Sequence, residues 1–169
     1  MEHDTIIPEL QRNKHVFESL LKELSEELIT WKKNESTWCL LEIICHLLDE
    51  EVEDFRARTR HALETPDLPL KPIHPGEWPE ERAYLAQNYE EVLNKFLFER
   101  QVSIEWLKSL EQPKWKQAFQ HPTLGAQSAE HLLANWLAHD YHHIRQINAI
   151  KRDYLKFKSG DDLTYAGIW

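Results

Sequence analysis

Apolar side chains recur at helical spacing through the first third of the chain. Between residues 10 and 28 they stand three, four or seven positions apart, so the pattern predicts a helix that begins near Pro8 and ends near residue 29 or 30. A polar turn at 31–36 follows. A second stripe of the same period predicts a helix from residue 36 or 37 to about Leu63, and its apolar positions are Leu40, Ile43, Ile44, Leu47, Leu48, Val52 and Phe55.

Five prolines interrupt the helical pattern after this second helix. Proline fixes φ and removes a backbone donor, so residues 65–79 are predicted to be an extended connection without a helix of their own. A link of about fifteen residues exceeds the roughly 2 to 8 that join antiparallel neighbours in a bundle. It therefore indicates a crossover that leaves the second and third helices parallel. A proline-rich motif for a protein partner is the alternative, but no P-x-x-P flanked by basic residues in an exposed tail supports it.

Two further helices are predicted in the second half of the chain. One runs from residue 79 or 80 to Pro113, which ends it, and the other runs from about Ser128 to residue 154 or 155. Residues 115–128 are expected to form a loop with room for one helical turn, and the residues after 157 a packed tail. The fold class expected for residues 1–169 is therefore all-α: a single four-helix-bundle domain with a long crossover between helices two and three.

Composition and charge narrow the classes of function. The 169 residues include 20 basic and 29 acidic side chains, a net charge of −9, and the basic residues are scattered along the chain. Because phosphate contacts supply most of the affinity for nucleic acids, no nucleic-acid partner is expected. No window approaches the roughly 18 apolar residues of a membrane span, so no membrane association is expected either. Without a signal-peptide pattern, Cys39 and Cys45 are interpreted as reduced thiols of a cytoplasmic protein.

The candidate chemistry lies in the last predicted helix. At 100° per residue, His139 and His143 fall on the same face as Leu132, Trp136 and Ile147. Residues four apart stack one turn above another, so both imidazoles can bind one divalent transition metal at about 2.0 to 2.1 Å. A histidine on an apolar face is more often hydrogen-bonded within the core, and this alternative stays open for each ring.

Other candidates surround this pair. His142 points about 100° away and is expected at the surface or in an interface. On the second helix, His46 lies at the margin of the apolar stripe, on the same side as Cys39 and Glu50. Glu50 is either a general acid or base or part of a solvated face, and Cys39 either a catalytic thiol or a small buried hydrophobe. Asp140 has three open roles: an acceptor that orients a ligand imidazole, a partner in a surface or inter-helix salt bridge, or a general base.

Two segments of the chain resemble the DinB-like superfamily. Residues 42–49, Glu-Ile-Ile-Cys-His-Leu-Leu-Asp, are similar to its helix-two segment, and residues 139–147 match its H-x-x-H-H-x-x-Q signature. Members are four-helix bundles with a three-histidine metal site, so the resemblance implies His46, His139 and His143 as metal ligands. Some relatives are thiol-dependent transferases or isomerases, and others are described as metal-dependent hydrolases. The family's name refers to induction by DNA damage and not to DNA binding.

The chemistry of such a site follows from its ligands. Three neutral histidines leave the ion its full charge and at least one open position, the pattern of catalytic zinc sites. A bound water would have its pKa lowered toward about 7, and a low-molecular-weight thiol in its place would lose its proton. Zinc or nickel is favoured as the single ion, and iron or manganese also suits the site. A di-iron carboxylate bundle needs Glu-x-x-His pairs, which the sequence lacks.

Three hypotheses for the function are compatible with these features. The first is a mononuclear metal-dependent hydrolase or thiol-dependent transferase that acts on a small molecule. The second is a non-catalytic, metal-stabilised bundle that serves as a binding or interaction module, and the third is a metal-free bundle. Exposed aromatic residues such as Trp78 and Trp169 would support a homodimer in any of the three.

Overall fold

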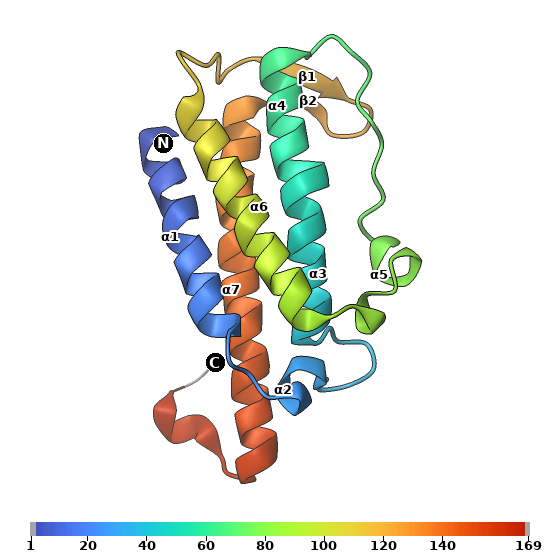
Figure 1. Cartoon of the computed structure of the whole chain (residues 1–169), viewed down its shortest axis with the longest axis vertical. Helices are drawn as coiled ribbons and strands as arrows, with labels where there is room; N and C mark the ends of the chain where they lie inside the picture. Colours follow the sequence, from blue (N-terminus) through green and yellow to red (C-terminus); the bar gives the residue numbers. More distant parts are fainter. Residues whose placement is uncertain (1–2, 168–169) are drawn as a thin grey trace.

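The computed structural model describes residues 3–167 and shows four long helical segments packed side by side (Figure 1). They are α1 (His3–Leu21), the segment from α3 (Leu40–Asp49) to α4 (Arg56–Glu64), α6 (Tyr89–Ser109) and α7 (Ala129–Ser159). The segments α1 and α7 run in one direction, and α3–α4 and α6 run in the other (Figure 1). The second and third long segments are therefore parallel, which confirms the predicted bundle with a crossover between them.

The first predicted helix is wrong beyond Leu21. The helix α1 ends there, Glu23 adopts a left-handed φ of 58°, and a separate short helix, α2 (Glu26–Thr30), follows. Ser25 caps α2 by accepting a hydrogen bond from the backbone N–H of Leu28 at 3.3 Å. The helical spacing of apolar residues in the sequence extends across this break, because Leu28 on α2 is also buried in the core.

The second predicted helix is confirmed in its extent but not in its regularity. It begins at Leu40 as α3 (Leu40–Asp49), continues through a π-helical segment, η1 (Glu50–Phe55), and ends as α4 (Arg56–Glu64). A carboxylate oxygen of Glu42 accepts a hydrogen bond from the backbone N–H of Cys39 at 2.9 Å, which stabilises the first turn. No sequence pattern indicated the π-helical turn.

The crossover is longer than predicted and has helical turns of its own. It spans residues 65–88 and contains α5 (Trp78–Glu81) and η2 (Tyr84–Ala86), so the third long helix begins at Tyr89 and not near residue 80. The break arises where Ala83 takes a left-handed φ of 45°. Trp78 is 3% exposed and packs in the core, which removes it as an exposed aromatic for a homodimer.

The segment before the last helix was predicted to be a loop and is a β-hairpin. The strands β1 (Ala118–His121) and β2 (Gly125–Ser128) pair antiparallel, with Ala118 opposite Ser128. Gly125 takes a φ of 73°, a conformation that glycine adopts without strain. Ser128 then caps α7 through the N–H of His131.

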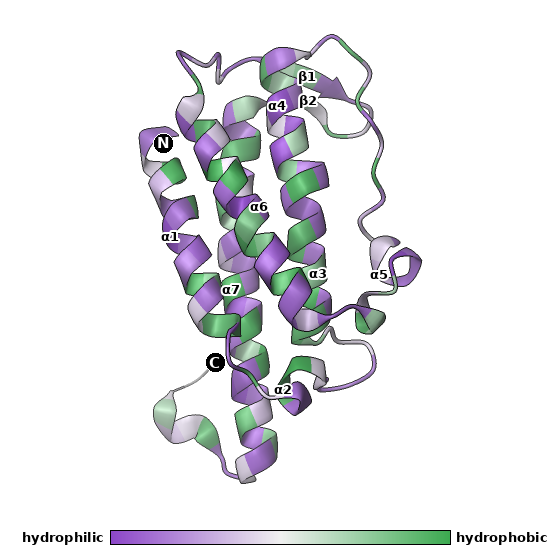
Figure 2. Ribbon diagram, viewed as in Figure 1, coloured by the Kyte–Doolittle hydropathy of each residue, from purple (hydrophilic) through white to green (hydrophobic). Residues whose placement is uncertain are grey.

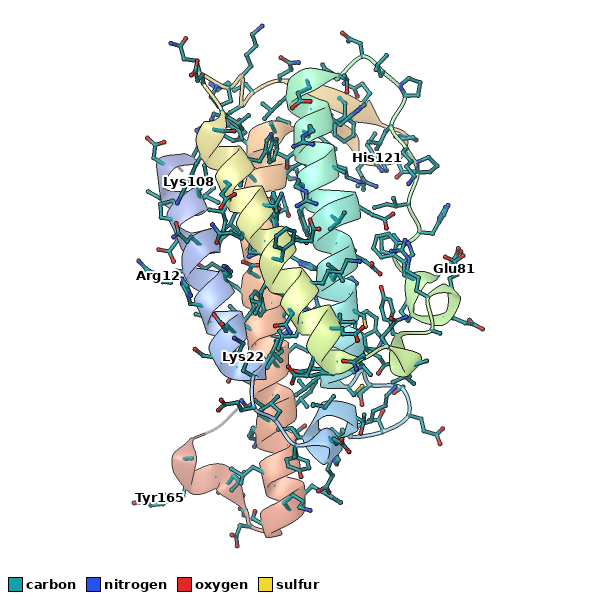
Figure 3. All side chains as sticks on the ribbon, viewed as in Figure 1. Arg12, Lys22, Glu81, Lys108, His121 and Tyr165 are labelled. Atoms are coloured by element: carbon teal, nitrogen blue, oxygen red, sulfur yellow. The ribbon has the colours of Figure 1, made fainter. Side chains whose placement is uncertain are left out.

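The helix α7 continues to Ser159, beyond its predicted end, and projects past the other long helices (Figure 1). A short turn, η3 (Leu163–Ala166), follows it. Tyr165 is fully exposed and points away from the protein (Figure 3), so the expected packed tail is wrong here. Trp169 lies outside the described residues.

The core fills the space between the long helices, and apolar and polar positions alternate around each of them (Figure 2). Charged side chains such as Arg12 and Glu81 point outward (Figure 3). Within residues 3–167, no helix has the length and apolar character needed to cross a membrane.

Candidate metal centre

Three histidines from two helices meet at one point inside the bundle. His46 lies in the last turn of α3, and His139 and His143 lie one turn apart on α7. The Nε2 atom of His139 is 3.3 Å from that of His46 and 3.0 Å from that of His143. One ligand atom from each ring lies within 4.8 Å of the other two. The structure thus brings together all three residues that the family resemblance implied.

The outer nitrogens of the rings decide which atom faces the centre. The Nδ1 atom of His143 lies 2.8 Å from Oε1 of Gln146, so Nδ1 carries the proton and Nε2 presents its lone pair. The Nδ1 atom of His46 is buried without a hydrogen-bond partner among the described residues, and Oε1 of Glu50 lies 3.9 Å from it. His143 thus has the arrangement of a ligand histidine whose outer nitrogen is bonded to an acceptor, and a carboxyl lies near the outer nitrogen of His46.

Burial keeps the three rings neutral. Desolvation lowers the pKa of His46 to about 4 and that of His143 to about 3, and the neighbouring imidazoles add to the effect on His143. Burial likewise lowers the pKa of His139. Neutral imidazoles whose Nε2 lone pairs converge repel one another unless a cation or a shared proton lies between them.

The spacing of the nitrogens fits a metal ion. Ligand nitrogens at about 2.05 Å from a tetrahedral ion lie roughly 3.3 Å apart. The two measured separations, 3.3 and 3.0 Å, are close to this value. The donor set is therefore suited to a divalent transition metal with an open position.

The π-helical turn explains how two consecutive acidic residues are both buried. Glu50 and Glu51 open η1, and the backbone N–H of Glu50 bonds to the carbonyls of both His46 and Leu47. Glu50 is 6% exposed and faces His46, whereas Glu51 is 1% exposed and faces α6. Such turns occur often at functional sites. The solvated helix face considered for Glu50 is therefore wrong.

The carboxyl of Glu50 and the thiol of Cys39, both candidates for a catalytic role, differ in their surroundings. Burial, with Asp54 nearby, raises the pKa of Glu50 to about 8. Cys39 is fully buried at the start of α3, and burial raises the pKa of its thiol. A buried thiol with a raised pKa is a poor nucleophile, so the small-hydrophobe interpretation of Cys39 fits.

Asp140 takes part in a buried inter-helix ion pair. Its two carboxylate oxygens accept hydrogen bonds from Nη1 and Nη2 of Arg100 on α6, each at 2.7 Å, and Asn13 donates a third at 3.1 Å. Arg100 also donates to Glu51 at 2.9 Å, as does the indole of Trp136. The structure therefore places Asp140 in the salt bridge, one of its three predicted roles, and its carboxylate is occupied away from the histidines.

Arg100 and Glu51 were not identified from the sequence as residues of a buried ion pair. Their side chains are each 1% exposed and lie in the centre of the bundle. Desolvation alone would lower the pKa of Arg100, but attraction to the two carboxylates outweighs it and raises the pKa. The one available signal was an arginine at a core-facing position of a predicted helix.

A cleft opens from the histidines to the surface. It has a volume of about 650 Å³, within the range of small-molecule sites. One wall is the connection between α2 and α3, and the other is the part of α7 that follows His143. His142 lines the cleft and is exposed, as predicted.

Comparisons with known proteins agree with this geometry. A sequence model of the DinB superfamily matches residues 9–147. Among solved structures, YfiT from Bacillus subtilis superposes with a TM-score of 0.80 at 18% sequence identity, covering 91% of this chain and 90% of that chain. YfiT is described as a probable metal-dependent hydrolase with an unusual four-helix bundle topology. No curated protein matches the sequence.

Proposed function

Because this chain belongs to the DinB superfamily, we propose that it binds one divalent transition metal through His46, His139 and His143 and uses it to transform a small molecule. The reaction is hydrolysis or the transfer of a low-molecular-weight thiol. The observation that carries the proposal is the convergence of three neutral imidazoles at the floor of an open cleft. The description of YfiT as a metal-dependent hydrolase supports the hydrolytic alternative.

Each residue of the centre has a defined task in this proposal. The three Nε2 atoms hold the ion, Gln146 accepts the proton on the outer nitrogen of His143, and the carboxyl of Glu50 lies 3.9 Å from the outer nitrogen of His46. A divalent ion held there supplies positive charge that lowers the pKa of a water or thiol and polarises a substrate carbonyl. The walls of the cleft are partly exposed, so a small molecule could reach the open position of the ion.

The donor set favours zinc or nickel, and iron or manganese is compatible with it. The decisive experiment measures metal content by mass spectrometry on untagged protein purified without chelator or charged resin. We expect about one ion per chain, lost when His46, His139 and His143 are all replaced by alanine and retained in the matched variant His142→Ala. No metal in the wild-type protein after addition of zinc, nickel and manganese would refute the proposal.

A non-catalytic role for the ion is the second candidate, because the ligands come from two helices. An ion bound by His46 on α3 and by two histidines on α7 would cross-link these helices and stabilise the bundle. In that case zinc raises the Tm of the protein, but no hydrolysis or thiol transfer is detected across a panel of small esters, amides and electrophiles. Turnover that disappears in the triple variant would favour the enzyme.

A homodimer in the cytoplasm remains part of the proposal. Leu155, Phe157 and Tyr165 are exposed near the projecting end of α7 and would be covered in a dimer. Light scattering on the purified protein tests this directly, since a monomer at all concentrations would exclude it.

A further inference from the structure

The indole of Trp38 lies directly beside the proposed metal centre. Its ring is 5.0 Å from that of His46, with an angle of 61° between the planes. Trp38 is only partly buried, and it lines the cleft together with the three histidines. A group bound to the ion therefore has an aromatic surface next to it.

Trp31 supplies a second aromatic surface farther along the same cleft. Its ring contacts Tyr154 at 5.7 Å and Phe157 at 5.9 Å, both on the projecting end of α7. Glu27 fixes this arrangement, because it accepts hydrogen bonds from Tyr154 and Lys158, each at 3.0 Å. The position of Trp31 is thus set by contacts between α2 and α7 and does not depend on a ligand.

The rest of the cleft is apolar or uncharged apart from one ion pair. Ala149 and Ile150 line the α7 wall, and the charged residues Lys33 and Asp153 lie 2.8 Å apart. The hydrogen bond from Lys33 lowers the pKa of Asp153, so the carboxylate stays ionised and is paired with Lys33. Among the described lining residues, a ligand body meets aromatic rings, methyl groups and the uncharged polar side chains of Ser36, Thr37 and Gln146, and it meets no unpaired charge.

We infer that the cleft selects a small molecule with a flat aromatic body, which contacts Trp38 and Trp31 while its polar head reaches the metal. This inference rests on the proposed function and adds the class of substrate to it. Aromatic bodies are favoured over aliphatic ones of similar size because indole rings prefer stacked or edge-to-face contacts with other rings. Trp38 and Trp31 are then specificity-determining residues and have no part in the chemical step.

The test uses three hydroxamates, whose common head group binds divalent metals and whose bodies differ. Isothermal titration calorimetry on the zinc-loaded protein compares acetohydroxamate, benzohydroxamate and naphthohydroxamate. We expect naphthohydroxamate to bind at least about thirtyfold more tightly than acetohydroxamate, a difference of roughly 2 kcal/mol. Benzohydroxamate should lie between them.

Substitutions assign the preference to the two indoles. In Trp38→Leu the ratio of the affinity for naphthohydroxamate to the affinity for acetohydroxamate should fall at least fivefold. Trp38→Phe should retain most of this ratio because an aromatic ring remains. Trp31→Leu should also reduce the ratio of the affinity for naphthohydroxamate to that for acetohydroxamate. The matched control is Trp106→Leu, since Trp106 on α6 packs against Arg60 on α4 and does not line this cleft.

The outcomes separate this inference from the proposed function. Equal, zinc-dependent binding of all three hydroxamates would overturn the aromatic selectivity and leave the metal centre standing. A preference that persists in both Trp38→Leu and Trp31→Leu would also overturn it. Failure of the protein to bind zinc, or of all three hydroxamates to bind the zinc-loaded protein, would overturn both proposals.

Discussion

Replacing Arg100 by methionine should destabilise the protein more than any other single change of charge on α6. The guanidinium is 1% exposed and donates hydrogen bonds to Glu51 and to both carboxylate oxygens of Asp140. Methionine has a similar volume, so the change removes the cation without opening a large cavity. Among the donors in residues 3–167, Asp140 keeps only the amide of Asn13, and Glu51 keeps only the indole of Trp136.

The size of the loss follows from leaving two buried carboxylates without their cation. Breaking a buried ion pair in this way costs about 3 to 5 kcal/mol. Native domains have a free energy of unfolding of about 5 to 15 kcal/mol, so the variant should lose about a fifth of it or more. For a chain of this size the Tm should fall by about 6 to 20 °C. Urea unfolding followed by circular dichroism measures the free energy, and Arg12→Met, which removes an exposed ion pair with Glu9, is the matched control.

The pH dependence gives a second, independent readout for the same variant. Burial raises the pKa of Asp140, and Arg100 opposes the rise, so the pKa should rise further when Arg100 is absent. A carboxyl whose pKa is higher in the folded than in the unfolded state favours folding at low pH and loses that contribution as the pH rises. The difference in the free energy of unfolding between wild type and Arg100→Met should therefore become smaller as the pH falls from about 8 to about 5. A variant as stable as Arg12→Met, or a deficit that grows on acidification, would refute this reasoning.

Three further predictions concern the metal centre. Glu50→Gln should weaken zinc binding by about 10- to 100-fold in a calorimetric titration, because the substitution removes the carboxyl that faces Nδ1 of His46; unchanged affinity would remove Glu50 from the site. Chelation should lower the Tm of the wild-type protein and leave that of the triple alanine variant unchanged, since zinc at about 100 times its Kd adds about 2.7 kcal/mol to the folded state. Burial lowers the pKa of His46 to about 4 and that of His143 to about 3, so these groups favour folding above the unfolded pKa and lose that contribution as the pH falls. The metal-free protein should therefore lose stability between about pH 7 and pH 5, and the triple variant should lose less; equal slopes in urea unfolding would contradict the buried, neutral state of the rings.

The long helices could be predicted from the sequence because each buries an apolar stripe of helical period. Their ends could not, because a stripe continues wherever the next segment still faces the core. Leu28 is buried in both the predicted and the observed arrangement, although a break at Glu23 separates it from α1. The hairpin at 118–128 was missed for a related reason, since strands of four residues give too little alternation to recognise.

The three histidines could be found because ligand spacing and the family resemblance both point to them. The buried ion pair could not, because a charged residue at a core-facing position has no partner in the sequence until the helices are packed. Arg100 meets Asp140 and Glu51 across distances of 40 and 49 residues. Glu50 was misjudged because a regular helix would not bury two adjacent carboxylates on different sides, whereas the π-helical turn does.

The continuous helix α7 fixes the reach of the cleft. It carries His143 at the floor and Asp153 at the mouth, and a helix rises about 1.5 Å per residue, so the two positions are about 15 Å apart along its axis. No joint lies between them that would let one end move without the other. A molecule held at the histidines can therefore extend only about this far before it passes the ion pair of Asp153 with Lys33 and enters solvent. The length of one helix thus sets an upper size for the part of a substrate that the protein can enclose.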